Sequence, residues 1–388
     1  MLIYDFLINR NPAGLNDICM IHNSQTVSYG QFKEDIFKLA QKLSSKLSKG
    51  KKLLIIREKS IDQLLYMLAA TVAGVIPVIT DIRESNKNIL GRLTANIQPD
   101  LVIDNSFISG NQLGSLPEIN AHDIFLGALS SGTTGDHKVI FRDHESWVSA
   151  FPHQSRIFNI KDGSRLFVAG SLAYTANLNS IVHMLNSNGS VVLTDHKNPL
   201  KWASAIKENN VDNIFMVPTN YRRLLHVMEE PMSFISSVVS AGEKLDPGTA
   251  MKLKEIFPNA RITEYYGASE LGHVSYLHFQ DMIKGNNRIG KPFPEVIIKI
   301  INGEICVESP YVAPAFRPKH SVGDKGYFDE EGFLCFEGRN NDIINKAGVK
   351  ISPAKIENAL LRNPFIDDAV AFGVDHGLKG SEIYCLAV

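Results

Sequence analysis

A chain of 388 residues with 44% hydrophobic and 21% charged residues has the composition of a globular protein, and it is too long for one ordinary core. Forty basic residues face 41 acidic ones, so no bulk field would recruit nucleic acid or an anionic membrane surface. The four cysteines are far apart and form no C-x-x-C pair, which favours isolated thiols in a reducing compartment: Cys19, Cys306, Cys335 and Cys385.

The apolar stretch from residue 64 to residue 80 is the segment that most resembles a membrane span. It is short, and Gly74 and Pro77 divide it, so we expect a buried helix that runs into a buried strand. At the N-terminus, Met1-Leu2-Ile3-Tyr4 meets Asp5 directly, without the basic and apolar regions of a signal peptide. The sequence therefore predicts a soluble cytoplasmic protein without a membrane span.

Short apolar runs alternate with helical patterns over most of the chain. We expect strands at 53–56, 75–79, 101–103, 125–129, 166–168, 191–193, 214–217 and 238–239, with a helix at 61–73. Strands that are continuously apolar, and that alternate with helices, are typical of parallel sheets covered on both faces. From about residue 288, strands at 296–301, 304–307 and 333–336 are separated by the turn pairs Asn302-Gly303 and Glu331-Gly332, which predicts a small β-rich lobe.

A polar stretch, Gly338-Arg339-Asn340-Asn341-Asp342, then interrupts the pattern and reads as a hinge. Beyond it we expect a helix at 353–361 and strands at 369–371 and 383–387. The predicted fold is α/β. Residues 1–340 would form a large N-terminal domain of two parallel α/β sheet lobes plus the small β-rich lobe. Residues 341–388 would begin a mobile C-terminal α+β subdomain that looks unfinished.

One loop stands out chemically: Ser130-Ser131-Gly132-Thr133-Thr134-Gly135-Asp136-His137-Lys138 follows an apolar strand. Its glycines let backbone N–H groups converge on an anion, its hydroxyls add donors, and its lysine adds a positive charge. The spacing is neither the Walker pattern nor the dinucleotide G-x-G-x-x-G pattern. From composition alone, an anion-binding loop and an ordinary loop both stay open.

This loop resembles the signature loop of the adenylate-forming superfamily, which comprises acyl- and aryl-CoA synthetases, peptide-synthetase adenylation domains and luciferases. His137 and Val139 depart from the usual Pro and Gly. Further motifs resemble the family in the family's order, from Val27 onward: Ser240-Ala241-Gly242-Glu243-Lys244-Leu245, Tyr265-Tyr266-Gly267-Ala268-Ser269-Glu270, Arg288-Ile289-Gly290-Lys291-Pro292, Gly303-Glu304-Ile305, Gly323-Asp324 and Gly338-Arg339.

The resemblance implies a role for each of these motifs in an ATP site. The loop Ser130 to Gly135 with Lys138 would grip the outer phosphates, and Glu270 would hold Mg²⁺. Tyr266 would lie against adenine, Gly242 and Glu243 would lie along the edge of the base, and Gly267 and Ser269 would be further residues of the ATP site. Asp324 would take the ribose hydroxyls, because one carboxylate offers two acceptors. Arg339 would contact ribose and phosphate, and Lys138, Glu270 and Arg339 are the expected catalytic residues.

The implied reaction is attack of a carboxylate on the α-phosphorus of ATP, which releases pyrophosphate. A thiol, from coenzyme A or from the phosphopantetheine of a carrier protein, would then displace AMP. Two departures weigh against full activity. The hinge residue is Asn341 instead of the usual Asp or Lys, and the family's late C-terminal lysine has no counterpart before Val388; Lys346 and Lys350 do not match its motif. A truncated chain, a natural short form and a non-catalytic nucleotide-binding member therefore stay open.

The substrate segment is expected after the strand at 166–168, with a pocket formed by Tyr174, Thr175 and Gly267. No acid stands there to pair with an α-ammonium, which disfavours an α-amino acid. The length is similar to that of stand-alone bacterial enzymes that activate dihydroxybenzoate for siderophores such as petrobactin. A small aryl acid is the first candidate, with fatty acyl-CoA synthesis as the alternative.

Two rival motifs are incomplete. The sequence Gly267-Ala268-Ser269-Glu270-Leu271 lacks the second glycine of a serine-hydrolase elbow. The pair His144-Glu145 lacks the second histidine that a zinc protease needs four residues later.

Overall fold

The computed structural model describes residues 1–81, 86–105, 110–130, 138–285, 287–339, 344–346, 349–351, 353–360, 363, 366, 369–375 and 381–388. These residues form two compact units. The first comprises residues 1–216 and 313–316, and the second comprises residues 217–312 and 317–388. We describe each unit by itself.

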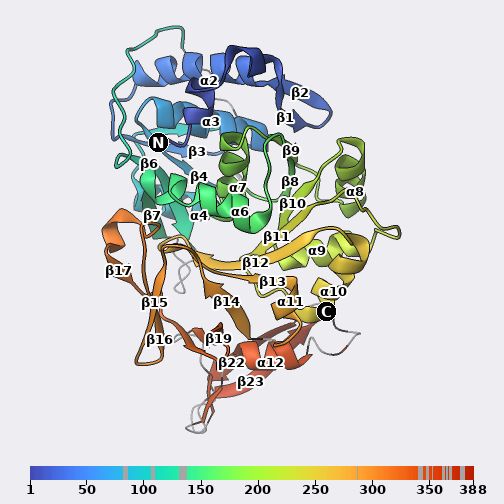
Figure 1. The fold of residues 1–388 in the computed structure, drawn as a ribbon. Coiled ribbons are helices and arrows are strands. Elements are labelled where there is room, and N and C mark those ends of the chain that lie inside the picture. The colour runs from blue at the N-terminus through green and yellow to red at the C-terminus, as the bar shows by residue number, and fades with distance from the viewer. Residues whose placement is uncertain are drawn as a thin grey trace. The chain divides into compact units, whose positions relative to one another are not determined.

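The first unit contains a mostly parallel sheet and a smaller parallel sheet, with helices packed against them (Figure 1). The larger sheet has the order β10-β8-β9-β1-β2, in which β2 alone is antiparallel. The smaller has the order β4-β3-β5 and is parallel throughout. A separate antiparallel pair is formed by β6 and β7. The strands of the first unit are β1 (Ile18–His22), β2 (Gln25–Ser28), β3 (Lys52–Ile55), β4 (Ile76–Ile79), β5 (Leu101–Ile103), β6 (Ile124–Ser130), β7 (Lys138–Asp143), β8 (Arg165–Ala169), β9 (Ser190–Thr194) and β10 (Asn213–Met216).

The longest helix of the first unit begins at a capping serine. The side chain of Ser28 accepts a hydrogen bond from Gln31 N (3.2 Å) and so caps the longest helix, whose buried face recurs every three to four residues. That helix packs on the one that follows β3 (Figure 1). The helices are α1 (Asp5–Ile8), α2 (Tyr29–Ser44), α3 (Ser60–Val72), α4 (Lys87–Ile97), α5 (Glu145–Val148), α6 (Phe151–Phe158), α7 (Thr175–Asn186) and α8 (Pro199–Glu208), with 3-10 turns at Pro12–Asn16 and Pro314–Phe316.

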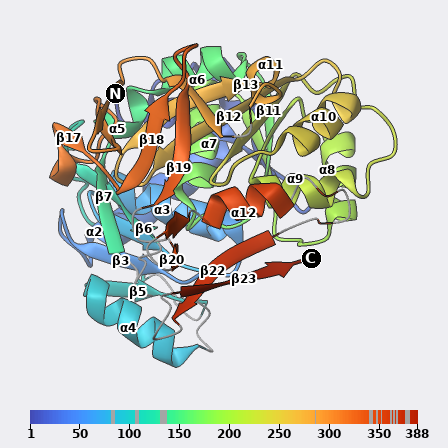
Figure 2. The same cartoon turned by 90° about the horizontal axis from the view of Figure 1, so that it is seen from below.

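The second unit is dominated by a sheet of order β11-β12-β13-β14-β19-β18-β16-β15, in which only β11 and β12 pair in parallel. The neighbouring strands β18 and β19 are seen in Figure 2. The strands of this sheet are β11 (Ser237–Ala241), β12 (Arg261–Ala268), β13 (Gly272–His278), β14 (Arg288–Pro292), β15 (Ile297–Ile301), β16 (Glu304–Glu308), β18 (Asp324–Phe328) and β19 (Leu334–Arg339), with β17 (Lys319–His320) paired to β16.

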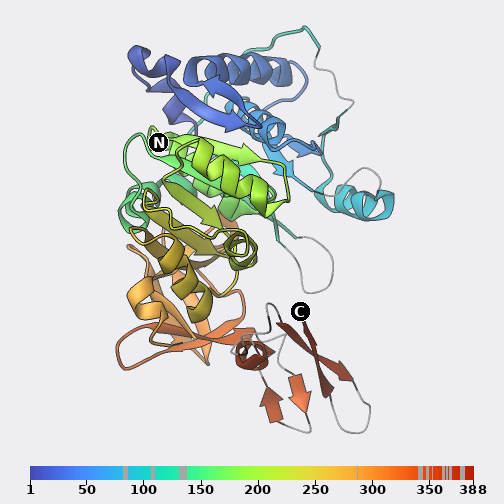
Figure 3. The same cartoon turned by 90° about the vertical axis from the view of Figure 1, so that its right-hand side faces the viewer.

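The C-terminal part of the second unit consists of two small antiparallel pairs and a helix. The last pair is the dark red ribbon that ends at the C-terminus in Figure 3. These elements are β20 (Ile344–Lys346), β21 (Val349–Ile351), α12 (Pro353–Leu360), β22 (Ala369–Asp375) and β23 (Ser381–Ala387). The other helices of the unit are α9 (Pro218–Leu225), α10 (Pro247–Ile256) and α11 (Phe279–Met282).

The predicted α/β class is confirmed, and the expected strands and the helix at 61–73 appear with boundaries that differ by a few residues. The turn pair Asn302-Gly303 joins β15 to β16 with positive φ angles of 52° and 79°, as the hairpin prediction requires. The predicted boundary at residues 340 and 341 lies outside the described residues and stays a prediction. All four cysteines are described and free, and no described helix is long and apolar enough to cross a membrane.

Candidate functional site

The glycine-rich loop connects two antiparallel strands. Ser130, the last residue of β6, pairs with Lys138, the first residue of β7, so the two ends of the loop are held side by side. The side chain of Lys138 is exposed at this end of the hairpin. The predicted phosphate-binding residues Ser131, Gly132, Thr133, Thr134 and Gly135 lie outside the described residues, and their role stays a prediction.

The second signature motif forms the hairpin of β12 and β13. Its register shifts between Tyr266 and Gly267, which is a β-bulge. A Cβ atom on Gly267 would lie 2.3 Å from the carbonyl oxygen of Gly272, so only glycine fits this position. Ser269 and Glu270 occupy the turn that follows, and both are partly buried. The bulge and the turn therefore fix the backbone position from which the Glu270 side chain extends.

Asp324 is the centre of a hydrogen-bonded cluster in the second unit. Its Oδ2 accepts a hydrogen bond from the Tyr266 hydroxyl (2.5 Å), and its Oδ1 accepts one from Nε of Arg339 (3.1 Å). Asp324 and Arg339 are direct partners in the register of β18 and β19, whereas Tyr266 comes from β12. Asp324 is only 2% exposed, while the Arg339 side chain is 53% exposed. The structure therefore joins three residues that the sequence predicted for one nucleotide site.

The Tyr266 hydroxyl is a permanent donor in this cluster. Burial, and then the charge of Asp324, raise the pKa of Tyr266 well above 10, with a smaller contribution of the same sign from Glu270. Because the phenol stays protonated at neutral pH, it always presents its proton to the carboxylate. The contribution of Glu270 also indicates that its carboxylate is within electrostatic reach of Tyr266.

The turn after β11 is anchored from two sides. Gly242 has a φ of +93°, which a side-chain-bearing residue rarely adopts. Lys244 forms an ion pair with the buried carboxylate of Glu264, and Leu245 N donates to the same carboxylate (2.8 Å). Burial raises the pKa of Glu264, and the charge of Lys244 opposes that shift. The turn therefore leaves β11 in one fixed direction.

Glu243 is held by residues of α9 that sequence reasoning missed. Thr219 Oγ1 donates to Glu243 Oε2 (2.9 Å), and Arg222 Nη2 lies 4.0 Å from the same oxygen. Arg222 also donates to Thr219 Oγ1 (3.1 Å) and lies 3.6 Å from Asp246. In sequence these residues look like the polar face of a surface helix, and no local signal connects them to the turn.

The predicted substrate residues lie at the start of α7. Tyr174 directly precedes the helix and Thr175 is its first residue, and both are partly buried. This position follows β8, the strand between β10 and β9 in the larger sheet of the first unit. Gly267 belongs to the second unit, and the hinge residue Asn341 lies outside the described residues, so the predicted pocket and hinge stay predictions.

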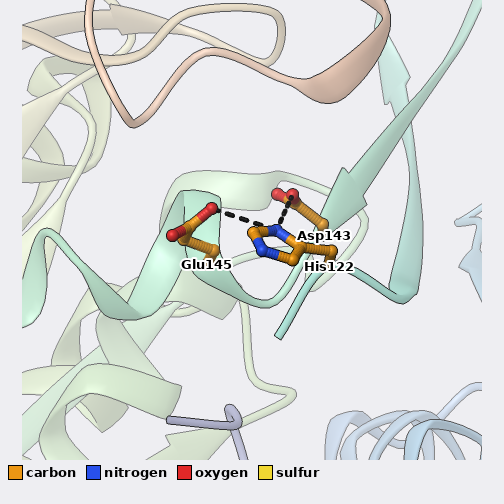
Figure 4. A group of neighbouring side chains, drawn as sticks. All are labelled: His122, Asp143 and Glu145. Carbon is orange, nitrogen blue, oxygen red and sulfur yellow. Dashed lines mark ion pairs between the residues drawn. The ribbon is translucent and has the colours of Figure 1, made fainter. Parts of the chain in front are cut away.

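One group of described side chains has donor atoms suited to a metal ion: His122, Asp143 and Glu145 (Figure 4). Nδ1 of His122 lies 3.2 Å from Glu145 Oε2 and 4.0 Å from Asp143 Oδ2. The imidazole of His122 is exposed and lies between the two carboxylates, and these side-chain contacts account for the group without a metal. The group belongs to the first unit and does not include Glu270, the residue predicted to hold Mg²⁺.

His144, the residue between two members of that group, is structural. Its Nδ1 accepts a hydrogen bond from Ile3 N (3.1 Å), and its ring packs against Phe125. Burial lowers the pKa of His144 to about 4, so the ring is neutral at physiological pH. His144 therefore has a structural role in the core of the first unit.

Comparison with known proteins finds a matching family model and similar enzymes. Residues 92–316, more than half of the chain, match the family model described as AMP-binding enzyme. An uncharacterized acyl-CoA ligase of Bacillus subtilis is 27% identical over 90% of this chain and 81% of its own length. A putative long chain fatty acid-CoA ligase of Staphylococcus epidermidis is 23% identical over 96% of this chain and 84% of its own length.

Solved structures share the fold. The o-succinylbenzoate CoA synthetase of Bacillus subtilis, in complex with its acyl-adenylate intermediate, superposes with a TM-score of 0.86 at 20% identity, covering 98% of this chain and 87% of that one. ATP-bound MatB from Rhodopseudomonas palustris superposes with a TM-score of 0.84 at 18% identity, covering 100% of this chain and 88% of that one.

Proposed function

This chain belongs to the AMP-binding enzyme family, and from that premise we propose that it is an AMP-forming ligase that activates a carboxylic acid with ATP. The observation that carries the proposal is the Asp324 cluster. A buried carboxylate with two acceptor oxygens, held between Tyr266 and Arg339, suits the paired hydroxyls of a ribose. Arg339 keeps half of its side chain exposed, where it can also meet a phosphate.

In the proposed reaction, a carboxylate oxygen of the acid attacks the α-phosphorus of ATP. The bond between the α-phosphorus and the bridging oxygen breaks, pyrophosphate leaves with that electron pair, and an acyl-adenylate forms. The protein contributes positioning and charge, with Lys138 at the outer phosphates and Arg339 near the ribose and phosphate. A thiolate then attacks the acyl carbon, and AMP leaves.

Mg²⁺ fits the Glu270 position. The partly buried Glu270 carboxylate lies at a hairpin turn, where its charge acts on Tyr266 and His320 and can also meet a cation. Magnesium is commonly bound by one or two carboxylates together with substrate phosphates. When bound, it would supply charge neutralisation for the leaving pyrophosphate.

The acid and the thiol acceptor define two candidate activities. The first is activation of a small aryl acid, such as a dihydroxybenzoate in siderophore assembly; Tyr174 at the start of α7 offers a ring against which an aryl acid can stack. The second is fatty acyl-CoA synthesis, which the names of the Bacillus and Staphylococcus relatives favour. Those names also favour coenzyme A over the phosphopantetheine of a carrier protein as the acceptor.

The decisive experiment is ATP–pyrophosphate exchange over a panel of aryl, fatty and amino acids. Acid-dependent exchange supports the ligase, and the fastest acid identifies its class. For the aryl proposal, benzoates exchange far faster than decanoate, and the reverse order would favour the fatty acyl candidate. Binding of ATP without exchange by any acid would instead identify a non-catalytic nucleotide-binding protein. Product assays with coenzyme A and with a phosphopantetheinylated carrier protein then distinguish the acceptors.

A further inference from the structure

The connection from β8 to α7, residues 170–174, lies where parallel α/β sheets bind ligands. β8 runs parallel to both of its neighbours, β10 and β9, so this connection begins at the carboxyl end of a central strand. Ligands of such sheets bind beyond the carboxyl ends of the strands. The connection leads directly to Tyr174, the residue predicted to stand beside the acid.

A buried amide reaches into this connection from the first turn of α7. Asn177 is only 4% exposed, and its Nδ2 donates to the backbone oxygen of Ser171 (2.8 Å). Ala173 N in turn donates to Ser171 Oγ (3.0 Å), so the backbone segment that accepts the hydrogen bond from Asn177 is itself held in place. Since Oδ1 and Nδ2 share one carbon atom, the Oδ1 of Asn177 is also fixed beside this connection.

That oxygen accepts no hydrogen bond from any residue that the structure describes. A buried acceptor without a donor costs about 1–3 kcal/mol, so it is retained only for a reason. Two residues further along the same helix, Asn179 Oδ1 does have a donor, Gln154 Nε2 at 3.0 Å. A second buried asparagine oxygen without a donor, in Asn213, lies at the first residue of β10 and therefore at the opposite edge of the sheet.

We propose that Asn177 is a specificity-determining residue whose Oδ1 receives a hydrogen bond from a hydroxyl group of the acid substrate. This inference rests on the proposed ligase function and sharpens its substrate class to hydroxylated acids. The donor is neutral, because residues 170–177 contain no carboxylate that would balance an ammonium group. A site built around such an acceptor discriminates against an analogue that lacks the hydroxyl, because the oxygen then stays unpaired.

The test compares matched acids in two variants. The acids are benzoate with its 2-, 3- and 4-hydroxy derivatives, and octanoate with its 2- and 3-hydroxy derivatives. Asn177→Leu keeps the branching and the number of heavy atoms of the side chain, and it removes the Oδ1 acceptor together with the Nδ2 donor to Ser171. Asn179→Ala serves as the control, since it removes a buried asparagine of the same helix whose oxygen already has a donor.

In the wild-type protein, kcat/KM in pyrophosphate exchange should be about 10- to 100-fold higher for one hydroxylated acid than for its parent acid, as expected for one hydrogen bond to a buried group. In Asn177→Leu this ratio should fall to near one while KM for ATP stays within about twofold. In Asn179→Ala the ratio should persist. An equal ratio in wild type and Asn177→Leu, as expected if a water molecule satisfies the oxygen, would overturn the inference.

A binding measurement separates failure of this inference from failure of the proposed function. Absence of exchange with every acid overturns the ligase proposal. The thermal stabilisation of the protein by the same acids then decides the inference. Stabilisation by a hydroxylated acid that exceeds that of its parent, and that is lost in Asn177→Leu, supports it. Equal stabilisation by both acids, or no stabilisation by either, overturns it.

Discussion

Replacement of Tyr266 by phenylalanine removes one hydroxyl and leaves the aromatic ring in place. The structure loses the 2.5 Å hydrogen bond to Asp324 Oδ2, while Arg339 still donates to Oδ1. Asp324 is 2% exposed, so bulk water cannot easily replace the lost donor. A hydrogen bond to a charged group contributes about 1.5–3 kcal/mol, and we therefore expect the free energy of unfolding to fall by about that amount.

The same change should weaken nucleotide binding through the ribose. If the less well oriented carboxylate weakens ATP binding by about 1.4 kcal/mol, KM for ATP in pyrophosphate exchange rises about tenfold. The preference for ATP over 2′-deoxy-ATP should shrink as well, because Asp324 no longer holds its orientation. Since the Tyr266 phenol stays protonated far above neutral pH, the difference between wild type and variant should be constant from pH 6 to pH 9.

Tyr276→Phe provides the matched control. Tyr276 lies opposite Tyr265 in the register of β12 and β13, and its hydroxyl forms no hydrogen bond with a described residue. Its replacement should leave both KM and stability nearly unchanged. Equal KM values for ATP in wild type and Tyr266→Phe, together with equal free energies of unfolding, would refute the role that we assign to the Asp324 cluster.

Three further predictions concern the remaining framework. Lys244→Met leaves the buried Glu264 carboxylate without its cation, so we expect urea denaturation to show a free energy of unfolding that is lower by about 3 kcal/mol. The double variant with Glu264→Gln should recover much of this stability. A single variant as stable as wild type would contradict this. Gly267→Ala should abolish exchange, because its Cβ would lie 2.3 Å from a backbone oxygen across the hairpin; full activity would show that the bulge is dispensable. Burial lowers the pKa values of His144 and His183 to about 4 and about 3, below the usual value of about 6.5, so the unfolded state binds more protons in mild acid. Stability should therefore fall as pH drops from about 6.5 to about 4, by up to about 1.4 kcal/mol per pH unit for each histidine, and His183→Gln should reduce this slope in urea titrations; an unchanged slope would contradict the assignment.

The sheet strands could be predicted because their burial leaves a plain pattern. The run 191–193, for example, lies within β9, whose five residues are all buried, and the helix expected at 61–73 is α3, bounded by Ser60 and Val72. The antiparallel pairing of β6 with β7 was not expected. Both faces of β6 are largely buried, so its apolar run looks the same as that of a parallel strand.

The site shows a similar division. Tyr266, Asp324 and Arg339 could be predicted because each stands in a short motif that resembles a known family, and the structure joins them across β12, β18 and β19. Thr219 has no such motif. It stands in a helix whose polar residues look solvated, and only the fold brings its hydroxyl to Glu243. The sequence did not indicate Asn177 either, because the packed structure, and not the sequence pattern, decides whether a buried polar atom has a hydrogen-bond partner.

We propose that this chain forms an acyl-adenylate, and single-turnover analysis of the products formed from ATP tests this reaction most directly. The protein is mixed with ATP, Mg²⁺ and the acid selected by exchange, without a thiol, and the products are identified by mass spectrometry. We predict an acyl-adenylate and pyrophosphate in equal amounts, with both lost in Asp324→Ala. ADP and phosphate in place of these products would contradict the proposed reaction, and acyl-adenylate formation that survives Asp324→Ala unchanged would contradict the role of Asp324.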